Sequence, residues 1–135
     1  MIRMSQAAFA KLAGGKIAKG TLKPTEMNGT ERKYDEYLMA RQLAGEIPWY
    51  KYEPFRLRLA DNTTYTPDFG VMESNGELEC IDVKGSKFNR ETGRETYWCM
   101  EDSKIKVKMA AELFPFRFVI AFLARSGVWK REVIG

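Results

Sequence analysis

The sequence predicts an α/β fold in which a mixed central β-sheet is flanked by helices. Three observations lead to this fold class. Residues 28–44 carry apolar side chains at helical spacing. Two short strand-like segments are joined by Asn75-Gly76, which is a strong signal for a tight hairpin turn. Residues 116–123 are apolar nearly throughout, as expected of a strand that is buried on both faces.

The chain of 135 residues is 44% hydrophobic and 30% charged, which is ordinary for a globular protein of one domain. No apolar run approaches the ~20 residues that span a bilayer, and the opening segment lacks the apolar core of a secretory signal. We therefore expect a cytoplasmic protein without a membrane partner. Residues 27–135 are expected to form a single domain behind an arm of residues 1–26.

The side chains present limit the chemistry that is available. The chain contains no histidine, which excludes Ser-His-Asp triads, histidine-based acid–base pairs and most zinc sites. Cys80 and Cys99 lack the spacing of metal ligands, so we expect reduced thiols, with Cys80 as a small buried hydrophobe. Carboxylates, lysines, tyrosines and a bound metal ion are left to carry any chemistry.

The N-terminal arm is basic, with lysines spread through a glycine-rich stretch of little periodicity. This composition indicates a flexible arm with room for a short helix. Its lysines, among them Lys16 and Lys19, either contact phosphate groups or are simply solvated. The net charge of +4 permits a nucleic-acid partner without requiring one.

The first predicted helix spans about residues 28–44. Glu31 lies on its apolar stripe, because Tyr34 and Leu38 follow it at helical spacing. A carboxylate on a buried stripe has two explanations. Glu31 either reaches a metal site beneath the helix or forms a capping box with Asn28, and the two roles are compatible.

A long strand is expected next, over residues 49–60, because this stretch is rich in aromatic and aliphatic side chains. Pro54 interrupts it, which favours an edge position or a bulge. Asp61-Asn62 is the expected turn into the following strand, which covers residues 65–69.

Asp68 and Asp82 are the candidates for a functional site, because they stand on the two strands of the predicted hairpin. Side chains alternate along a strand, so Lys84 shares a face with Asp82, whereas Glu79 points to the other face. Two carboxylates at one edge of a sheet suit a hard cation such as Mg²⁺. A lysine beside the water of that cation would complete a hydrolytic site.

Basic residues follow this site along the chain. Three of them fall in an expected loop over residues 85–96 and could follow a nucleic-acid backbone past the metal: Lys87, Arg90 and Arg94.

A second helix is expected over about residues 97–114, with a core stripe formed by Ile105, Met109 and Leu113. Lys104 and Lys108 lie on another face, which either meets the nucleic-acid backbone or is a solvated surface. The buried strand over residues 116–123 follows, and residues 128–134 form the last strand.

The chain resembles the PD-(D/E)XK nuclease superfamily in three features, which are Glu31 near the start of a first helix, Pro67-Asp68, and Asp82-Val83-Lys84 in a hairpin. The second acid is an Asp, one methylene shorter than the commoner Glu. More narrowly, segments within about residues 27–124 resemble a family of small phage proteins placed in that superfamily: residues 28–34, 49–69 and 112–118.

This resemblance implies a restriction-endonuclease-like core in α-β-β-β-α-β order that hydrolyses phosphodiester bonds with Mg²⁺, for which Mn²⁺ can substitute. It implies Asp68 and Asp82 as metal ligands, Lys84 as the catalytic lysine and Glu31 as the helix acid that completes the site. By resemblance we expect a DNA endonuclease selective for branched DNA such as a Holliday junction, in phage recombination or replication. Such an enzyme would act in the host bacterial cytoplasm, and junction symmetry favours a homodimer.

Two other classes of protein are compatible with the same residues. One is a nucleic-acid-binding module that keeps the fold without cutting. The other is a phage structural or partner-binding protein, in which Asp68 and Asp82 merely pair with Lys84 and neighbouring bases. Metal separates the three, because the nuclease needs it for turnover, the binding module need not, and the third class should ignore it.

Overall fold

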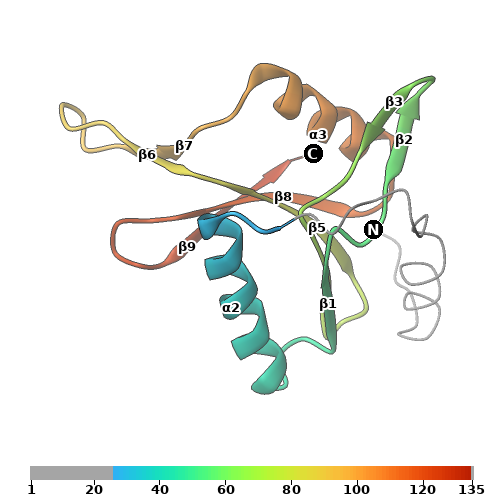
Figure 1. Cartoon of the computed structure of the whole chain (residues 1–135), viewed down its shortest axis with the longest axis horizontal. Coiled ribbons are helices and arrows are strands. Elements are labelled where there is room, and N and C mark those ends of the chain that lie inside the picture. Colours follow the sequence, from blue (N-terminus) through green and yellow to red (C-terminus); the bar gives the residue numbers. More distant parts are fainter. Residues whose placement is uncertain (1–25, 135) are drawn as a thin grey trace.

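A five-stranded mixed sheet forms the centre of the fold (Figure 1). The computed structural model describes residues 26–134. In this part of the chain the strand order is β1-β4-β5-β8-β9, in which β5 and β8 run parallel and the other neighbours run antiparallel. The strands are β1 (Trp49–Tyr52), β4 (Phe69–Met72), β5 (Leu78–Lys84), β8 (Arg117–Leu123) and β9 (Trp129–Ile134).

Helix α2 (Gly29–Leu43) lies on one face of this sheet (Figure 1). Its buried Tyr34 and Leu38 pack against strand residues that point to the same face. Because side chains alternate along a strand, these are every second residue of β4, β5 and β8: Phe69, Val71, Ile81, Val83, Val119 and Ala121. The chain leaves the helix at Gly45, whose φ of 78° is a left-handed conformation that suits glycine.

Helix α3 (Glu101–Leu113) covers the opposite face (Figure 1). The stripe predicted for this helix is partly wrong, because Met109 packs against the core but Ile105 and Leu113 are 49% and 56% exposed. The helix turns Val107 and Ala110 to the sheet, where they pack with Phe118 and Ile120 of β8. The spacing of the larger hydrophobic residues did not indicate this buried side.

The long strand predicted over residues 49–60 is in fact two strands in two different sheets. Strand β1 ends at Tyr52, and Glu53 takes a left-handed φ of 44° just before Pro54, which turns the chain out of the sheet. The predicted edge position is confirmed, because β1 is the first strand of the order. The second half forms β2 (Leu57–Ala60), which pairs with β3 (Thr63–Tyr65) in a hairpin beside α3.

The segment predicted as a loop over residues 85–96 also contains strands. Strands β6 (Ser86–Phe88) and β7 (Glu95–Tyr97) pair antiparallel and form a two-stranded ribbon that extends beyond the end of the sheet (Figure 1). The ribbon continues directly from β5 and leads into α3. Its side chains are exposed or half-buried, so it lacks the alternation of buried and exposed residues that identifies a strand in a sequence.

The predicted class, an α/β fold with a mixed central sheet between helices, is confirmed. When only the two helices and the strands of the central sheet are considered, their order along the chain is α2, β1, β4, β5, α3, β8 and β9. Strand β9 is the second edge strand of that sheet. Lys16 and Lys19 lie outside the described residues. No helix of residues 26–134 is long and apolar enough to cross a membrane.

Candidate metal centre

The β4–β5 hairpin brings Asp68 and Asp82 together, as the sequence predicts. In its register Phe69 pairs with Ile81, so Asp68, one residue earlier in the chain, stands opposite Asp82. The backbone N–H of Val83 donates a hydrogen bond of 2.8 Å to Oδ2 of Asp68, which holds this side chain against β5. Both acids therefore occupy the end of the hairpin that lies away from its turn.

Lys84, at the end of β5, is the third member of the site and contacts Asp82. Its Nζ lies 3.1 Å from Oδ2 of Asp82 and donates a hydrogen bond of 2.9 Å to Oγ of Ser103, in the first turn of α3. Burial lowers the pKa of Lys84, but the charge of Asp82 and hydrogen bonding to it raise that pKa more, and the net direction is upward. Lys84 is therefore a charged hydrogen-bond donor at neutral pH.

Asp82 is almost entirely enclosed, with 4% of its surface exposed. Its Oδ2 is close to the ammonium of Lys84, yet nothing in the described part of the chain gives this oxygen a well-aligned hydrogen bond. The ammonium of Lys84 is shared between Asp82 and Ser103, so its ion pair with Asp82 is poorly aligned for a hydrogen bond. A buried carboxylate oxygen without a hydrogen bond is unfavourable unless a cation or water satisfies it.

Asp68 is the acid whose ionisation the site disfavours. Burial is the largest cause, and the charge of Asp82 is the next. Together they raise the pKa of Asp68 to about 9, against the hydrogen bond from Val83, which lowers it. At neutral pH and without a cation, Asp68 therefore holds a proton beside Asp82. A cation that binds both carboxylates must displace that proton.

Tyr65 is a member of the site that the sequence did not reveal. It is buried at the end of β3, and its pKa is raised by burial first and then by the charges of Asp82 and Asp68. A neutral phenol beside two carboxylates can donate a hydrogen bond but cannot act as a base. Ser103 was missed as well. Neither residue has a spacing relative to the acids that any periodic element would predict.

Glu31 forms the capping box that the sequence offered as one of its two explanations. Its backbone N–H donates 2.8 Å to Oδ1 of Asn28, and its Oε1 accepts 3.0 Å from the N–H of Asn28. The hydroxyl of Tyr52 donates to the same Oε1 at 3.3 Å. The charge of Glu31 also contributes to raising the pKa of Asp68, so this carboxylate lies near the two acids although it is engaged in the cap.

A hard cation such as Mg²⁺ requires oxygen ligands, which carboxylates supply. Among residues 26–134, no group of three or more Asp, Glu, Cys or His side chains is close enough together to hold an ion. Asp68 and Asp82 fit such a cation as a pair, because the buried Oδ2 of Asp82 has only the poorly aligned ion pair with Lys84 and Asp68 resists carrying its own charge. Mg²⁺ is commonly held by one or two carboxylates, with water and substrate phosphate as its other ligands.

The opposite face of β5 has a different role, as its alternation predicts. Glu79 is 3% exposed, and its Oε2 accepts 2.6 Å from a guanidinium nitrogen of Arg131 on β9. The guanidinium of Arg117 lies 3.9 Å from the same oxygen.

Cys80, on the face of Asp82, is a free thiol that is 1% exposed, and burial raises its pKa. The expectation of a small buried hydrophobe at Cys80 is confirmed.

The described basic residues predicted to contact nucleic acid lie on two elements that follow Lys84 in the chain. Lys87, Arg90 and Arg94 are exposed on the β6–β7 ribbon, which continues from Lys84. Lys104 and Lys108 lie on α3, whose first turn carries Ser103 against Lys84.

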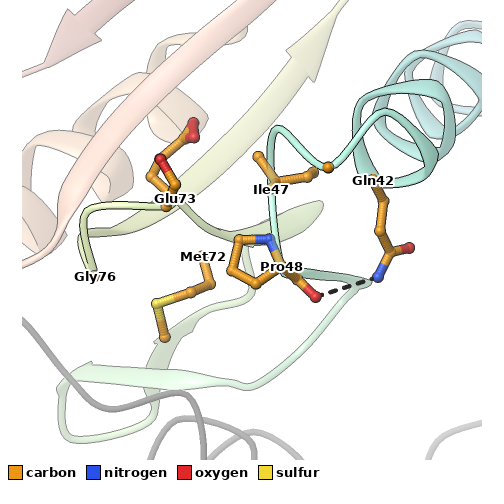
Figure 2. A pocket seen from close by; sticks show the side chains of 8 residues that line it. Gln42, Ile47, Pro48, Met72, Glu73 and Gly76 are labelled. Carbon is orange, nitrogen blue, oxygen red and sulfur yellow. Dashed lines mark hydrogen bonds between the residues drawn. The ribbon is translucent and has the colours of Figure 1, made fainter.

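A shallow pocket lies at the other end of β4 from Asp68, and Figure 2 shows it between the end of α2 and the β4–β5 turn. Gln42 donates through Nε2 to the backbone oxygen of Pro48 at its edge, at 3.4 Å. Glu73, in its wall, is paired with Arg41 at 3.2 Å. The pocket contains none of the predicted site residues and is separate from the acid pair.

Comparison of the chain with known protein families, with curated proteins and with solved structures finds no match.

Proposed function

We propose that this protein is a metal-dependent DNA endonuclease of the PD-(D/E)XK type. One observation carries the proposal. Asp68 and Asp82 stand opposite each other in a largely buried site, and the ammonium of Lys84 lies 3.1 Å from Asp82. The order of helices and central strands supports it, because it begins with the α-β-β-β-α-β arrangement that the resemblance implies.

In this proposal Asp68 and Asp82 hold Mg²⁺ or Mn²⁺, and Glu31, which is engaged in the cap of α2 and forms no three-acid group with them, acts through water. When bound, the cation would polarise a phosphoryl oxygen and lower the pKa of a bound water. Asp68 would give up its proton as the cation binds, since its pKa is near 9 in the cation's absence. Binding of the cation should therefore become tighter as the pH rises towards that value.

Lys84 acts as a donor in this scheme and not as a base, because the charge of Asp82 keeps its ammonium protonated. Its hydrogen bond to Ser103 aims the side chain along the end of β5. From there it can orient a water or stabilise negative charge on a phosphate oxygen. Tyr65, held neutral by burial and by the two acids, supplies a second donor on the buried side.

DNA is the proposed substrate, and the ribbon is the proposed contact with its backbone. Lys87, Arg90 and Arg94 project from an element that starts one residue beyond Gly85, so a strand crossing the acid pair would meet them next. We extend the proposal to branched DNA and to a homodimer, because a four-way junction presents equivalent strands to two copies of one site.

A non-catalytic DNA-binding module is the second candidate, and two contacts favour it. Lys84 is already paired with Asp82, and Glu31 is already engaged in the cap of α2. In that case the acids and the lysine would stabilise the fold, and the basic ribbon alone would bind DNA.

The test is cleavage of end-labelled linear duplex, single-stranded, flap and four-way-junction DNA in Mg²⁺, Mn²⁺ or EDTA. The variants are Asp82→Asn and Lys84→Ala, which remove one charge each. Lys33→Ala on the exposed side of α2 is the matched control for the loss of a lysine. We expect metal-dependent cutting that falls at least 100-fold in both site variants, the scale seen when a stabilising donor is lost, and is unchanged in the control.

Circular dichroism of each variant separates loss of activity from loss of fold. DNA binding without cutting by the folded wild type, on every substrate and with either metal, would reject the endonuclease and favour the binding module. If the folded wild type neither binds nor cuts DNA, both candidates are rejected.

A further inference from the structure

We propose that Trp98 is a stacking platform for an unpaired base of the DNA substrate, placed beside the end of β5 at the base of the ribbon. The inference rests on the proposed function and deepens it, because it assigns the substrate a single-stranded nucleotide that leaves the acid pair along the ribbon. Trp98 lies between β7 and α3, at the base of the ribbon.

The position of Trp98 is fixed by contacts with the end of β5. Its backbone N–H donates 2.8 Å to the carbonyl oxygen of Gly85, the residue that follows Lys84. A Cβ built on Gly85 would meet Cδ1 of the indole at 4.0 Å, so the ring itself is beside this residue. Cys99, the next residue along the chain, influences the ionisation of Lys84. The indole therefore lies beside Gly85 at the base of the ribbon, one residue along the chain from Lys84.

The indole is exposed, and the ammonium group of Lys87 lies over its ring. Trp98 is 63% exposed, although a tryptophan of a folded protein is highly buried on average. The Nζ of Lys87 lies 4.4 Å from the centre of its ring, within the range of a cation–π contact. Because the ammonium lies over one face of the ring, a base would stack on the other face or displace the lysine, and in both cases the ammonium stays close enough to meet the phosphate.

The charge around Trp98 favours a polyanion. The ribbon carries Lys87, Arg90 and Arg94 against two acids, Glu91 and Glu95. Glu95 is occupied, since its Oε2 accepts 2.9 Å from the backbone N–H of Arg125. The guanidinium of Arg125, from the β8–β9 turn, lies 4.1 Å from the centre of the ring of Phe88 on the ribbon, which is a second pairing of a cation and an aromatic ring.

The faces of the bases in an intact duplex are covered by their neighbours, so Trp98 can stack only on an unpaired or end base. This selects a single strand, a flap or an opened branch point over continuous duplex. The preference would arise from access to the face of a base and not from reading its edge, so it should tolerate any sequence.

The experiment compares binding, in EDTA, of an oligothymidylate of about twelve nucleotides and of an abasic strand of equal length. Both carry the same phosphates, and only the first has bases. The proteins are the wild type, Trp98→Ala, Trp98→Phe and the control Tyr37→Ala, which removes an exposed aromatic side chain from α2. Affinities are measured by fluorescence anisotropy of a terminal dye.

We expect Trp98→Ala to lose about 5- to 150-fold in affinity for the oligothymidylate, equivalent to the ~1–3 kcal/mol of base–aromatic stacking. It should lose little for the abasic strand. Trp98→Phe should retain most of the affinity, and Tyr37→Ala all of it.

If Trp98→Ala loses equal affinity for both strands, or loses none for either, the inference is overturned. Cutting of duplex by the wild type would in that case still support the nuclease. A loss confined to the strand with bases, in a protein that never cuts, would uphold the platform and reject the proposed function.

Discussion

Asp68 and Asp82 face each other across the β4–β5 hairpin, and the charge of Asp82 disfavours ionisation of Asp68. The charge of Asp82, after burial, raises the pKa of Asp68 to about 9. Lys84 lies 3.1 Å from Asp82 and partly compensates its charge. In the absence of a cation the site therefore holds two carboxyl groups, one proton and one ammonium.

The first prediction concerns the pH dependence of stability without metal. The pKa of Asp68 rises from ~3.9 in an unfolded chain to about 9 in the folded protein. Between these values the folded state binds the extra proton, so this group makes the free energy of unfolding fall as the pH rises, by at most about 1.4 kcal/mol per pH unit. Urea unfolding in EDTA between about pH 5 and pH 8 measures the slope.

Asp68→Asn should flatten this slope and leave the variant more stable than the wild type at pH 8. Asp61→Asn, at an exposed site in the β2–β3 turn, is the control and should leave the slope unchanged. An identical slope in the wild type and Asp68→Asn would show that Asp68 does not carry the proton.

The second prediction separates the two roles of Glu31. Glu31→Ala removes the acceptor of the Asn28 N–H and should lower the free energy of unfolding by about 1 kcal/mol, the typical effect of a lost cap. Glu31→Gln keeps an acceptor oxygen and should restore most of that stability. If cutting is also restored, the residue serves only the helix; if cutting stays low in a stable Gln variant, its charge serves the acid pair.

The third prediction tests the packing behind Asp68. A Cβ on Gly70 would lie 2.7 Å from Cγ of Pro54, whose ring cannot rotate away. Gly70→Ala should therefore lower the free energy of unfolding by about 1–3 kcal/mol through overpacking. Gly29→Ala, where nothing lies within 4 Å, should be neutral or stabilising in its helix. Similar losses in both variants in thermal unfolding would contradict this packing.

The fourth prediction uses the two faces of β5. Glu79→Gln weakens the contact with Arg131 and should lower the free energy of unfolding by about 1–3 kcal/mol. It should leave metal binding and cutting unchanged at temperatures where the variant is folded, because Glu79 faces α2. Asp82→Asn should lose metal binding and cutting and should not show the loss of stability expected for Glu79→Gln. Loss of metal binding in folded Glu79→Gln would mean that the cation does not lie on the face of Asp82.

Much of this arrangement could be predicted because local rules govern it. The turn at Asn75-Gly76 sets which strands pair, and strand alternation then places Asp82 and Lys84 on one face and Glu79 on the other. The cap of α2 is likewise readable from Asn28 and Glu31 alone.

The remaining features depend on long-range packing. Tyr65 joins the acids because the β2–β3 hairpin folds beneath α3, and no sequence spacing encodes that contact. The predicted stripe of α3 was partly wrong for a related reason, since packing against the sheet buries Val107 and Ala110 beside Met109 and leaves Ile105 and Leu113 exposed. The β6–β7 ribbon was predicted as a loop because its exposed strands lack a buried face.

The most direct test of the central claim is binding of Mn²⁺ to the acid pair, measured by the loss of the free-ion electron paramagnetic resonance signal at pH 8. We expect saturable binding by the wild type. Binding should be at least tenfold weaker in Asp68→Asn and Asp82→Asn, a loss of about 1.4 kcal/mol or more, and unchanged in Asp61→Asn. The wild type should also bind more weakly at pH 6, where Asp68 keeps its proton. Equal Mn²⁺ binding by all four proteins would contradict the claim that Asp68 and Asp82 form a metal site.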